Sequence, residues 1–289
     1  MKWRELLLAF CVPVTWALGF TVAKAALVEF PPLMLMSMRY FLSALVRVWF
    51  VPIPRHCLKD LFWISLVGST IQYGLTFTGL SMIDASLGGI VVQLEVPFGV
   101  LLAVIFLREQ PGVMRIIGML VSFGGIAIIA GLPSLHGQLY GMLLTGSGAL
   151  VWAVGQIMYK KISGRIDGLT GIAWIGVIAA PQMLVGSLIF ETGQLDALVN
   201  ATWVGWGSVL YLGLIMTAVG YGIWYTVLAR NPVSHVMPVL LILPVLTVGF
   251  SMLLLGERPS QGVLIGGFVV LCGVSLIVFA RSRPAETSP

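Results

Sequence analysis

The sequence is built from long apolar stretches separated by short polar breaks, and the stretches do not alternate between apolar and polar residues. A helix needs about 20 apolar residues to cross the hydrocarbon core of a membrane. Only helices and closed barrels satisfy their backbone hydrogen bonds there. The continuous runs therefore predict ten transmembrane helices, at roughly 5–28, 33–53, 59–80, 84–107, 112–131, 138–159, 168–190, 203–229, 233–255 and 260–280.

The composition is also that of a membrane protein, because 58% of the residues are hydrophobic and only 9% are charged. Soluble domains contain about 25% charged residues. The connections between the predicted helices are short and leave no room for a separate soluble catalytic or nucleic-acid-binding domain. The lipid bilayer is therefore an expected partner, and nucleic acid is not.

The net charge of +5 is explained by topology. Of the 16 Lys and Arg residues, 13 fall on one side of the predicted membrane, two fall on the other, and Arg39 lies within a span. Basic residues near helix ends are retained in the cytoplasm. We therefore expect both termini to be cytoplasmic in a multi-pass protein of the bacterial inner membrane.

The chain also repeats itself. Three pairs of segments match in register: "WALGFTVAK" (16–24) with "WAVGQIMYK" (152–160), "QYGLTFTGLSMIDAS" (72–86) with "GYGIWYTVLARNPVS" (220–234), and "REQPGVMRIIGMLVSFGG" (108–125) with "GERPSQGVLIGGFVVLCG" (256–273). Each half holds five predicted helices, so the second half enters the membrane from the opposite side. The predicted fold is an all-α membrane protein of ten transmembrane helices arranged as two inverted five-helix repeats. Many secondary transporters use inverted repeats, with the substrate bound near the midplane.

The expected domains are a first five-helix repeat over 1–131, a second over 138–281, and a cytoplasmic tail over 282–289. Several segments together resemble the EamA family of the drug/metabolite transporter superfamily along nearly the whole chain: "TWALGFTVAK", "PPLMLMSMRYFLSA", "ASLGGIVVQLEVPF", "VGYGIWYTVLARNPVSHVMP" and "LLLGERPSQGVLIGG". "PPLMLMSMRY" and "VGYGIW" are most similar to its cysteine and O-acetylserine exporter branch. The resemblance implies a secondary active transporter that exports amino acids or related metabolites.

Glu95 is where the chain departs from that resemblance, since "QLQVPF"-like segments of the family appear here as "QLEVPF". It lies about 16 Å from one end of its predicted helix, close to the membrane centre. An ionisable group there suggests a transport pathway or a proton relay. Two functional interpretations stay open: Glu95 carries a proton, or it balances a cationic group on the substrate. Two structural ones also remain: a protonated carboxyl hydrogen-bonded to a neighbouring helix, or an ion pair with Arg39.

Other candidate substrate-binding residues come from polar and aromatic positions within the spans. Tyr221, Trp224 and Tyr225 follow one stripe of the eighth helix, which either lines a pocket or packs between helices. The complete set of candidate substrate-binding residues is Trp16, Arg39, Gln72, Tyr73, Gln93, Glu95, Trp152, Tyr221, Trp224 and Tyr225.

Two prolines, Pro97 and Pro244, align within one residue in the two halves and predict matching kinks, because proline frees a carbonyl one turn back. The kinks form either a gate or plain packing. In a regular helix Gln93 and Glu95 project about 200° apart. Both can therefore face one cavity only if Pro97 distorts the helix.

The motifs of a membrane enzyme are missing from the sequence. His56, His136 and His235 stand apart, and HExxH, GxSxG and P-loop patterns do not occur. We expect no catalytic residues, no metal and no cofactor, and a small-molecule substrate with possible proton coupling. An importer, or a translocator of a nucleotide-linked or lipid-linked metabolite, remains the alternative function, and the sequence does not specify the oligomer.

Overall fold

In the computed structural model the described residues are 3–107, 112–132, 137–162, 164–231 and 237–280. Helices dominate this part of the chain, and it contains no strand. The repeat residues Glu109, Pro111 and Ser234 and the expected tail 282–289 lie outside it.

The helices form ten spans within the described residues, five in each half, which confirms the predicted all-α fold. In chain order the spans are α1 (Trp3–Ala26); α2 (Pro32–Arg47), extended by Val48–Phe50; α3 (Leu58–Ser65) with Leu66–Ile71 and α4 (Gln72–Met82); α5 (Ala85–Val91) with Val92–Leu94 and α6 (Glu95–Leu107); α7 (Val113–Ala130); α8 (Leu139–Lys160); α9 (Gly168–Phe190); α11 (Trp203–Leu210) with Tyr211–Val219 and α12 (Gly220–Arg230); Met237–Ile242 with α14 (Leu243–Phe250) and Ser251–Leu255; and α15 (Gln261–Phe279). A short helix, α10 (Gln194–Asn200), precedes α11. Eight spans are long and apolar enough to cross a membrane, and the ninth in chain order contains a shorter apolar helix, Val239–Leu255.

The repeat is visible in where the helices depart from regular α geometry. The third span widens to a π-helical segment over Leu66–Ile71, and its counterpart, the eighth, does so over Tyr211–Val219. The fourth and ninth spans tighten to 3₁₀ geometry over Val92–Leu94 and Met237–Ile242. Pro97 follows the first of these 3₁₀ segments, and Pro244 follows the second. The two prolines thus lie beside matching breaks in corresponding helices, and such breaks in α-helices have local causes of this kind.

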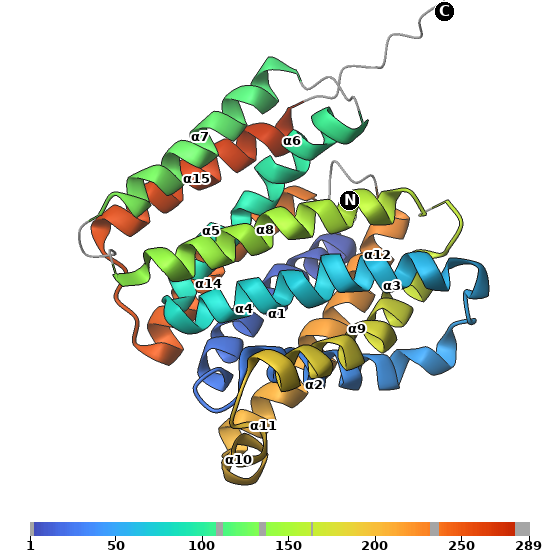
Figure 1. Ribbon diagram of the computed structural model, residues 1–289. Coiled ribbons are helices and arrows are strands. Elements are labelled where there is room, and N and C mark those ends of the chain that lie inside the picture. Colours follow the sequence, from blue (N-terminus) through green and yellow to red (C-terminus); the bar gives the residue numbers. More distant parts are fainter. Residues whose placement is uncertain (1–2, 108–111, 133–136, 163, 232–236, 281–289) are drawn as a thin grey trace, which may run out of the picture.

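Corresponding helices of the two halves pack against each other. α7 lies along α15, α2 along α9, and α5 against α14 (Figure 1). α8 packs on α4, and α1 on α12, so each of these pairs also joins one half to the other. The core of the bundle is therefore an interface between the two repeats.

Glycines bring α7 and α15 into close contact. A Cβ at Gly118 would lie 2.6 Å from the Gly273 carbonyl oxygen, and one at Gly273 would lie 2.6 Å from that of Gly118. Gly125 and Gly266 make the same reciprocal approach one level further along the pair. Small residues permit this approach because lipid supplies no hydrophobic force that would press larger faces together. We name this contact the glycine seam.

Candidate functional site

A cavity of about 570 Å³ lies between the two halves, within the size range of small-molecule sites. Residues of both repeats line it: Trp16, Phe20, Arg39, Gln72, Tyr73, Thr76, Phe77, Val92, Gln93, Glu95, Val96, Gly99, Val100, Ala103, Val104, Arg115, Trp152, Gln156, Met216, Tyr221, Trp224, Leu240, Leu243 and Val278. All the predicted substrate-binding residues except Tyr225 are in this set, and the side chain of Tyr225 lies outside the described part.

The cavity runs toward one end of the bundle. We call the end where α1 begins and α15 finishes the terminal end, and the opposite one the far end. Arg115, the third residue of α7, and Val278, near the end of α15, line the cavity close to the terminal end. Toward the far end, buried Phe30, Phe77 and Leu80 belong to one apolar cluster that closes the bundle.

Carboxylates of the second half help to hold the far end closed. Glu257 accepts hydrogen bonds from the backbone N–H groups of Ala85 and Ser86 at the start of α5, at 2.6 and 2.9 Å. Glu191 likewise accepts from Leu33 and Met34 at the start of α2, at 2.7 and 3.2 Å. Both pairs place a negative charge at the positive end of a helix that belongs to the first half.

A lysine adds a further contact at the far end. The Lys24 ammonium donates to the carbonyls of Leu80 and Ser81 at 2.9 and 3.0 Å, near the end of α4. Burial and the neighbouring Glu257 raise the pKa of Asp84, and Lys24 opposes that shift. The far end is therefore closed by polar contacts as well as by apolar packing.

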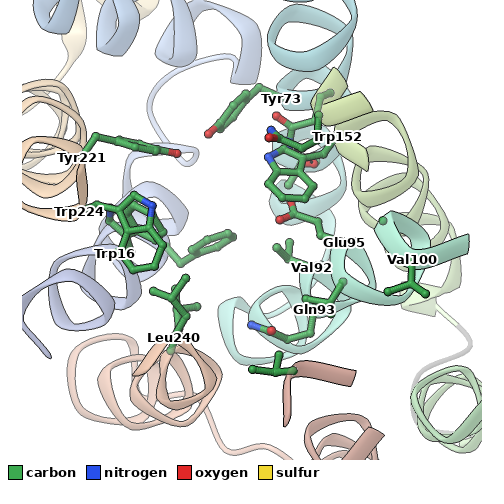
Figure 2. A pocket seen from close by; sticks show the side chains of 18 of the residues that line it. Trp16, Tyr73, Val92, Gln93, Glu95, Val100, Trp152, Tyr221, Trp224 and Leu240 are labelled. Carbon is green, nitrogen blue, oxygen red and sulfur yellow. Dashed lines mark hydrogen bonds between the residues drawn. The ribbon is translucent and has the colours of Figure 1, made fainter. Parts of the chain in front are cut away.

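One wall of the cavity is aromatic. The Trp16 ring from α1 lies 4.8 Å from the Tyr221 ring and 5.9 Å from the Trp224 ring of α12, between centroids. Figure 2 shows these three side chains together on one side of the cavity, above Leu240. The indole N–H of Trp16 is buried and has no hydrogen-bond acceptor in the described structure. We call these three residues the aromatic cluster.

The opposite wall is polar. Trp152 and Glu95 lie across the cavity from the aromatic cluster (Figure 2). The Glu95 carboxylate is only partly buried, and no residue of the described chain pairs with it by a salt bridge or a hydrogen bond. Gln72 donates from Nε2 to Thr76 Oγ1 at 3.1 Å, which leaves its buried Oε1 without a donor. This wall therefore presents the Glu95 carboxylate to a ligand.

Gln93 and Glu95 both line the cavity, and the reason is the 3₁₀ turn between α5 and α6. Each residue of a 3₁₀ helix advances about 120° rather than about 100°. The two side chains are therefore about 120° apart the shorter way round, instead of about 160°. At this smaller angle both side chains line the same cavity. The sequence predicted this arrangement only for a helix distorted beside Pro97, and the 3₁₀ turn is that distortion.

Arg39 is fully buried and does not pair with Glu95. Its Nε donates to Thr217 Oγ1 at 2.8 Å. Its guanidinium carbon lies 5.0 Å from the Tyr73 ring centroid and 5.7 Å from that of Tyr40. Nη2 has no acceptor in the described structure. Of the two structural interpretations of Glu95, the ion pair with Arg39 is thus absent, and so is a hydrogen bond to a neighbouring helix.

The sequence did not single out every lining residue. Gln156 was missed, although it follows Trp152 by four residues on α8 and so shares its face. Phe20 stands in the same relation to Trp16 on α1. The spacing rule would have found both. Pro97 and Pro244 do not line the cavity, and they act on it only through the helices that they interrupt.

Comparison with known proteins places this geometry in a family. The model of the EamA-like transporter family matches residues 3–131 and again 139–279. A protein of Escherichia coli (strain K12) named "Probable amino-acid metabolite efflux pump" is 31% identical, over 96% of both chains. A protein of Salmonella typhimurium (strain LT2) with the same name is 30% identical, also over 96% of both.

A solved structure described as "Crystal structure of protein" has a TM-score of 0.65 over 100% of both chains, at 17% identity, which supports the fold alone. The helical bundle, the cavity between its halves and the two matches to the family model all indicate the same class of protein. The protein is a multi-pass membrane transporter. The chain belongs to the EamA-like transporter family.

Proposed function

We propose that the protein exports amino acids or closely related small metabolites across the bacterial inner membrane by alternating access. The observation that carries this proposal is the cavity itself. It lies between two repeats and combines an apolar lining with the polar side chains of Gln93 and Glu95. Polar and ionisable side chains inside membrane spans are costly and mark transport pathways, so a bound solute explains why they line this cavity.

Two features support the export direction, namely the course of the cavity toward the terminal end and the charge pattern. The excess of basic residues favours a cytoplasmic location for the terminal end, so we propose that the cavity accepts its solute from the cytoplasm. Release on the other side requires the far end to open. The Glu257 and Glu191 contacts join the two halves there, as does the contact of Glu29 with Thr202, and such a movement would break them. The names of the Escherichia coli and Salmonella relatives support export of an amino-acid metabolite.

Proton coupling is the energy source that we propose. No nucleotide-binding motif occurs in the sequence, and accumulation against a gradient needs a coupled solute or ion. Purified protein in proteoliposomes, given a panel of labelled amino acids with and without an imposed proton gradient, tests both parts. The expected result is counterflow of at least one amino acid without a gradient, and net accumulation of that amino acid when the proton gradient is imposed.

Variants of the aromatic cluster make this test specific. Trp224→Ala or Tyr221→Ala should lower transport while leaving abundance and folding largely intact, because each removes a ring that lines the cavity. Tyr221→Ala is the cleaner of the two, since Trp224 is only 6% exposed. Trp203→Ala is the matched control, since Trp203 is an aromatic residue of the same span with 85% of its surface exposed. The proposal fails if no member of the panel is exchanged. Gradient-driven uptake from the far side would instead favour an importer.

A further inference from the structure

Glu95 is the charged side chain of the cavity that lacks a partner in the described structure. Arg39 and Arg115 also line the cavity. Arg39 is held between aromatic rings and by Thr217, as described above. Arg115 lies near the terminal end of the cavity, and neither arginine makes a salt bridge to Glu95. A carboxylate at this depth is expensive and marks a functional position.

The wall opposite Glu95 also favours positive charge. The faces of aromatic rings carry partial negative charge and attract cations, and Trp is the strongest of them. The Tyr221 and Trp224 rings lie 4.8 and 5.9 Å from the Trp16 ring, between centroids, and the three side chains lie across the cavity from Glu95 (Figure 2). A ligand between the two walls therefore meets a carboxylate on one side and the aromatic cluster on the other, where the Tyr221 hydroxyl points toward the cavity (Figure 2).

We propose that the cavity binds its substrate through a cationic nitrogen, held by the Glu95 carboxylate and facing the aromatic cluster. The inference rests on the proposed function, because it concerns the transported metabolite, and it adds which group of that metabolite is recognised. Gln72 Oε1 and the indole N–H of Trp16 are buried and unpaired in the described structure, so either group reaches the ligand only after its side chain turns toward the cavity.

Three compounds with the same isobutyl group distinguish binding through the substrate's cationic nitrogen from binding through its carboxylate. Leucine carries both charges, N-acetylleucine lacks the cation, and isoamylamine lacks the carboxylate. Binding to purified protein in detergent is measured by tryptophan fluorescence, and inhibition of leucine counterflow is measured in proteoliposomes. Loss of a charged hydrogen-bond partner lowers affinity by about ten-fold or more. N-acetylleucine should therefore bind at least about ten-fold more weakly than leucine, whereas isoamylamine should keep most of the affinity.

Glu95→Gln keeps the shape and removes the charge. It should lower the affinities for leucine and isoamylamine by about ten-fold and leave that for N-acetylleucine unchanged. Glu95→Asp, which keeps the carboxylate, is the matched control and should retain the preference for the cation. If Glu95→Gln does not fold, the ranking of the three compounds by the wild-type protein still decides the matter.

Other outcomes overturn the inference. Tighter binding of N-acetylleucine than of isoamylamine would show recognition through the carboxylate. Unchanged affinities in Glu95→Gln with loss of gradient-driven accumulation would make Glu95 a proton carrier instead. In both cases leucine is still exchanged, so the export proposal stands. Failure of that proposal is a different result, namely no exchange of any amino acid by the wild type.

Discussion

The two halves of the molecule share an aromatic frame and differ in polarity. Trp16 and Trp152, which the repeat relates, lie on opposite sides of the cavity (Figure 2), and Tyr73 and Tyr221, which it also relates, both line it. The fourth and ninth spans differ, however, at the positions just before their prolines. The fourth contributes Gln93 and Glu95 to the cavity, whereas the ninth contributes Leu240 and Leu243.

This difference teaches what each part of the duplication does. Residues common to the halves, such as the tryptophans and the seam glycines, set how the helices pack and where the cavity lies. Residues that diverged make the cavity asymmetric, so a bound solute meets an acidic wall and an apolar one. A symmetric frame lets the two halves exchange roles during transport, and an asymmetric lining gives the solute one preferred orientation.

The inverted relation between the halves is tested most completely by measuring on which side of the membrane each half ends. Reporter fusions after residues 57, 110, 163 and 283 should report the cytoplasm, and those after 30, 135 and 196 the periplasm. The expected signal is all or none, because five crossings separate the ends of each half. A fusion after 135 that reports the cytoplasm would mean an even number of crossings, and the halves would then not be inverted.

The glycine seam is the part of the frame on which both halves depend most directly. Gly125→Leu places a side chain where a Cβ already lies 2.7 Å from the Val270 nitrogen and 2.8 Å from the Gly266 oxygen. Overpacking of a core costs about 1–3 kcal/mol when side chains can yield, and here backbone atoms must move. We expect a large drop in the thermal unfolding midpoint in detergent.

The neighbouring Gly124→Leu is the control for this change. Gly124 is exposed and a Cβ there would meet nothing within 4 Å, so its unfolding midpoint should match the wild type. Equal midpoints for the two variants would show that α7 and α15 can separate at little cost.

The asymmetry between the fourth and ninth spans can be reversed. Glu95→Leu should lower affinity for a cationic ligand by about ten-fold. Adding Leu243→Glu returns a carboxylate to the same cavity from the other wall, and we expect it to recover affinity to within about three-fold of the wild type. Binding is measured on folded, monodisperse protein, because a carboxylate at this depth costs about 2.5 kcal/mol or more. Leu243→Gln on the Glu95→Leu background is the neutral control.

A double variant no better than Glu95→Leu alone would change the comparison. It would mean that the cavity needs the carboxylate at the position of Glu95, and the two walls would then differ in geometry as well as in charge.

Much of this architecture could be predicted from the sequence, for physical reasons. A helix needs about 20 apolar residues to cross the membrane, so each span can be recognised in the sequence as an apolar run. The matched segments of the two halves reveal the duplication. Part of the site could also be predicted, because polar residues such as Gln72 and Glu95 are rare and costly inside spans.

Local geometry could not be predicted in the same way. The 3₁₀ turn over Val92–Leu94, which lets Gln93 and Glu95 share a cavity, depends on how Pro97 packs. The hydrogen-bond partner of Arg39 could not be predicted from the sequence either. Its hydrogen bond to Thr217 joins residues of different halves, at a π-helical segment that no spacing rule indicates. The sequence suggested Glu95 as a partner for Arg39, and packing decided otherwise.

The smallest expected effect concerns the two tryptophans that the repeat equates. The indole N–H of Trp16 lacks an acceptor in the described structure, so Trp16→Phe removes a donor and keeps most of the ring. One neutral hydrogen bond contributes about 0.5–1.5 kcal/mol. Affinity for leucine should therefore fall about five-fold in Trp16→Phe if the substrate carboxylate accepts from this N–H. Affinity for isoamylamine, which has no carboxylate, should fall less, because only the weaker attraction of Phe for the cation affects it.

Trp152→Phe is the matched change in the other half. Trp152 lies on the Glu95 wall (Figure 2), where the cationic end of the substrate is placed, so its loss should affect leucine and isoamylamine equally. The informative quantity is the ratio of the two affinities, measured by counterflow inhibition for each variant. That ratio should shift in Trp16→Phe and remain constant in Trp152→Phe. A constant ratio in both would place the substrate carboxylate away from Trp16, and Arg39 Nη2, the other donor without an acceptor, would then be the group to replace.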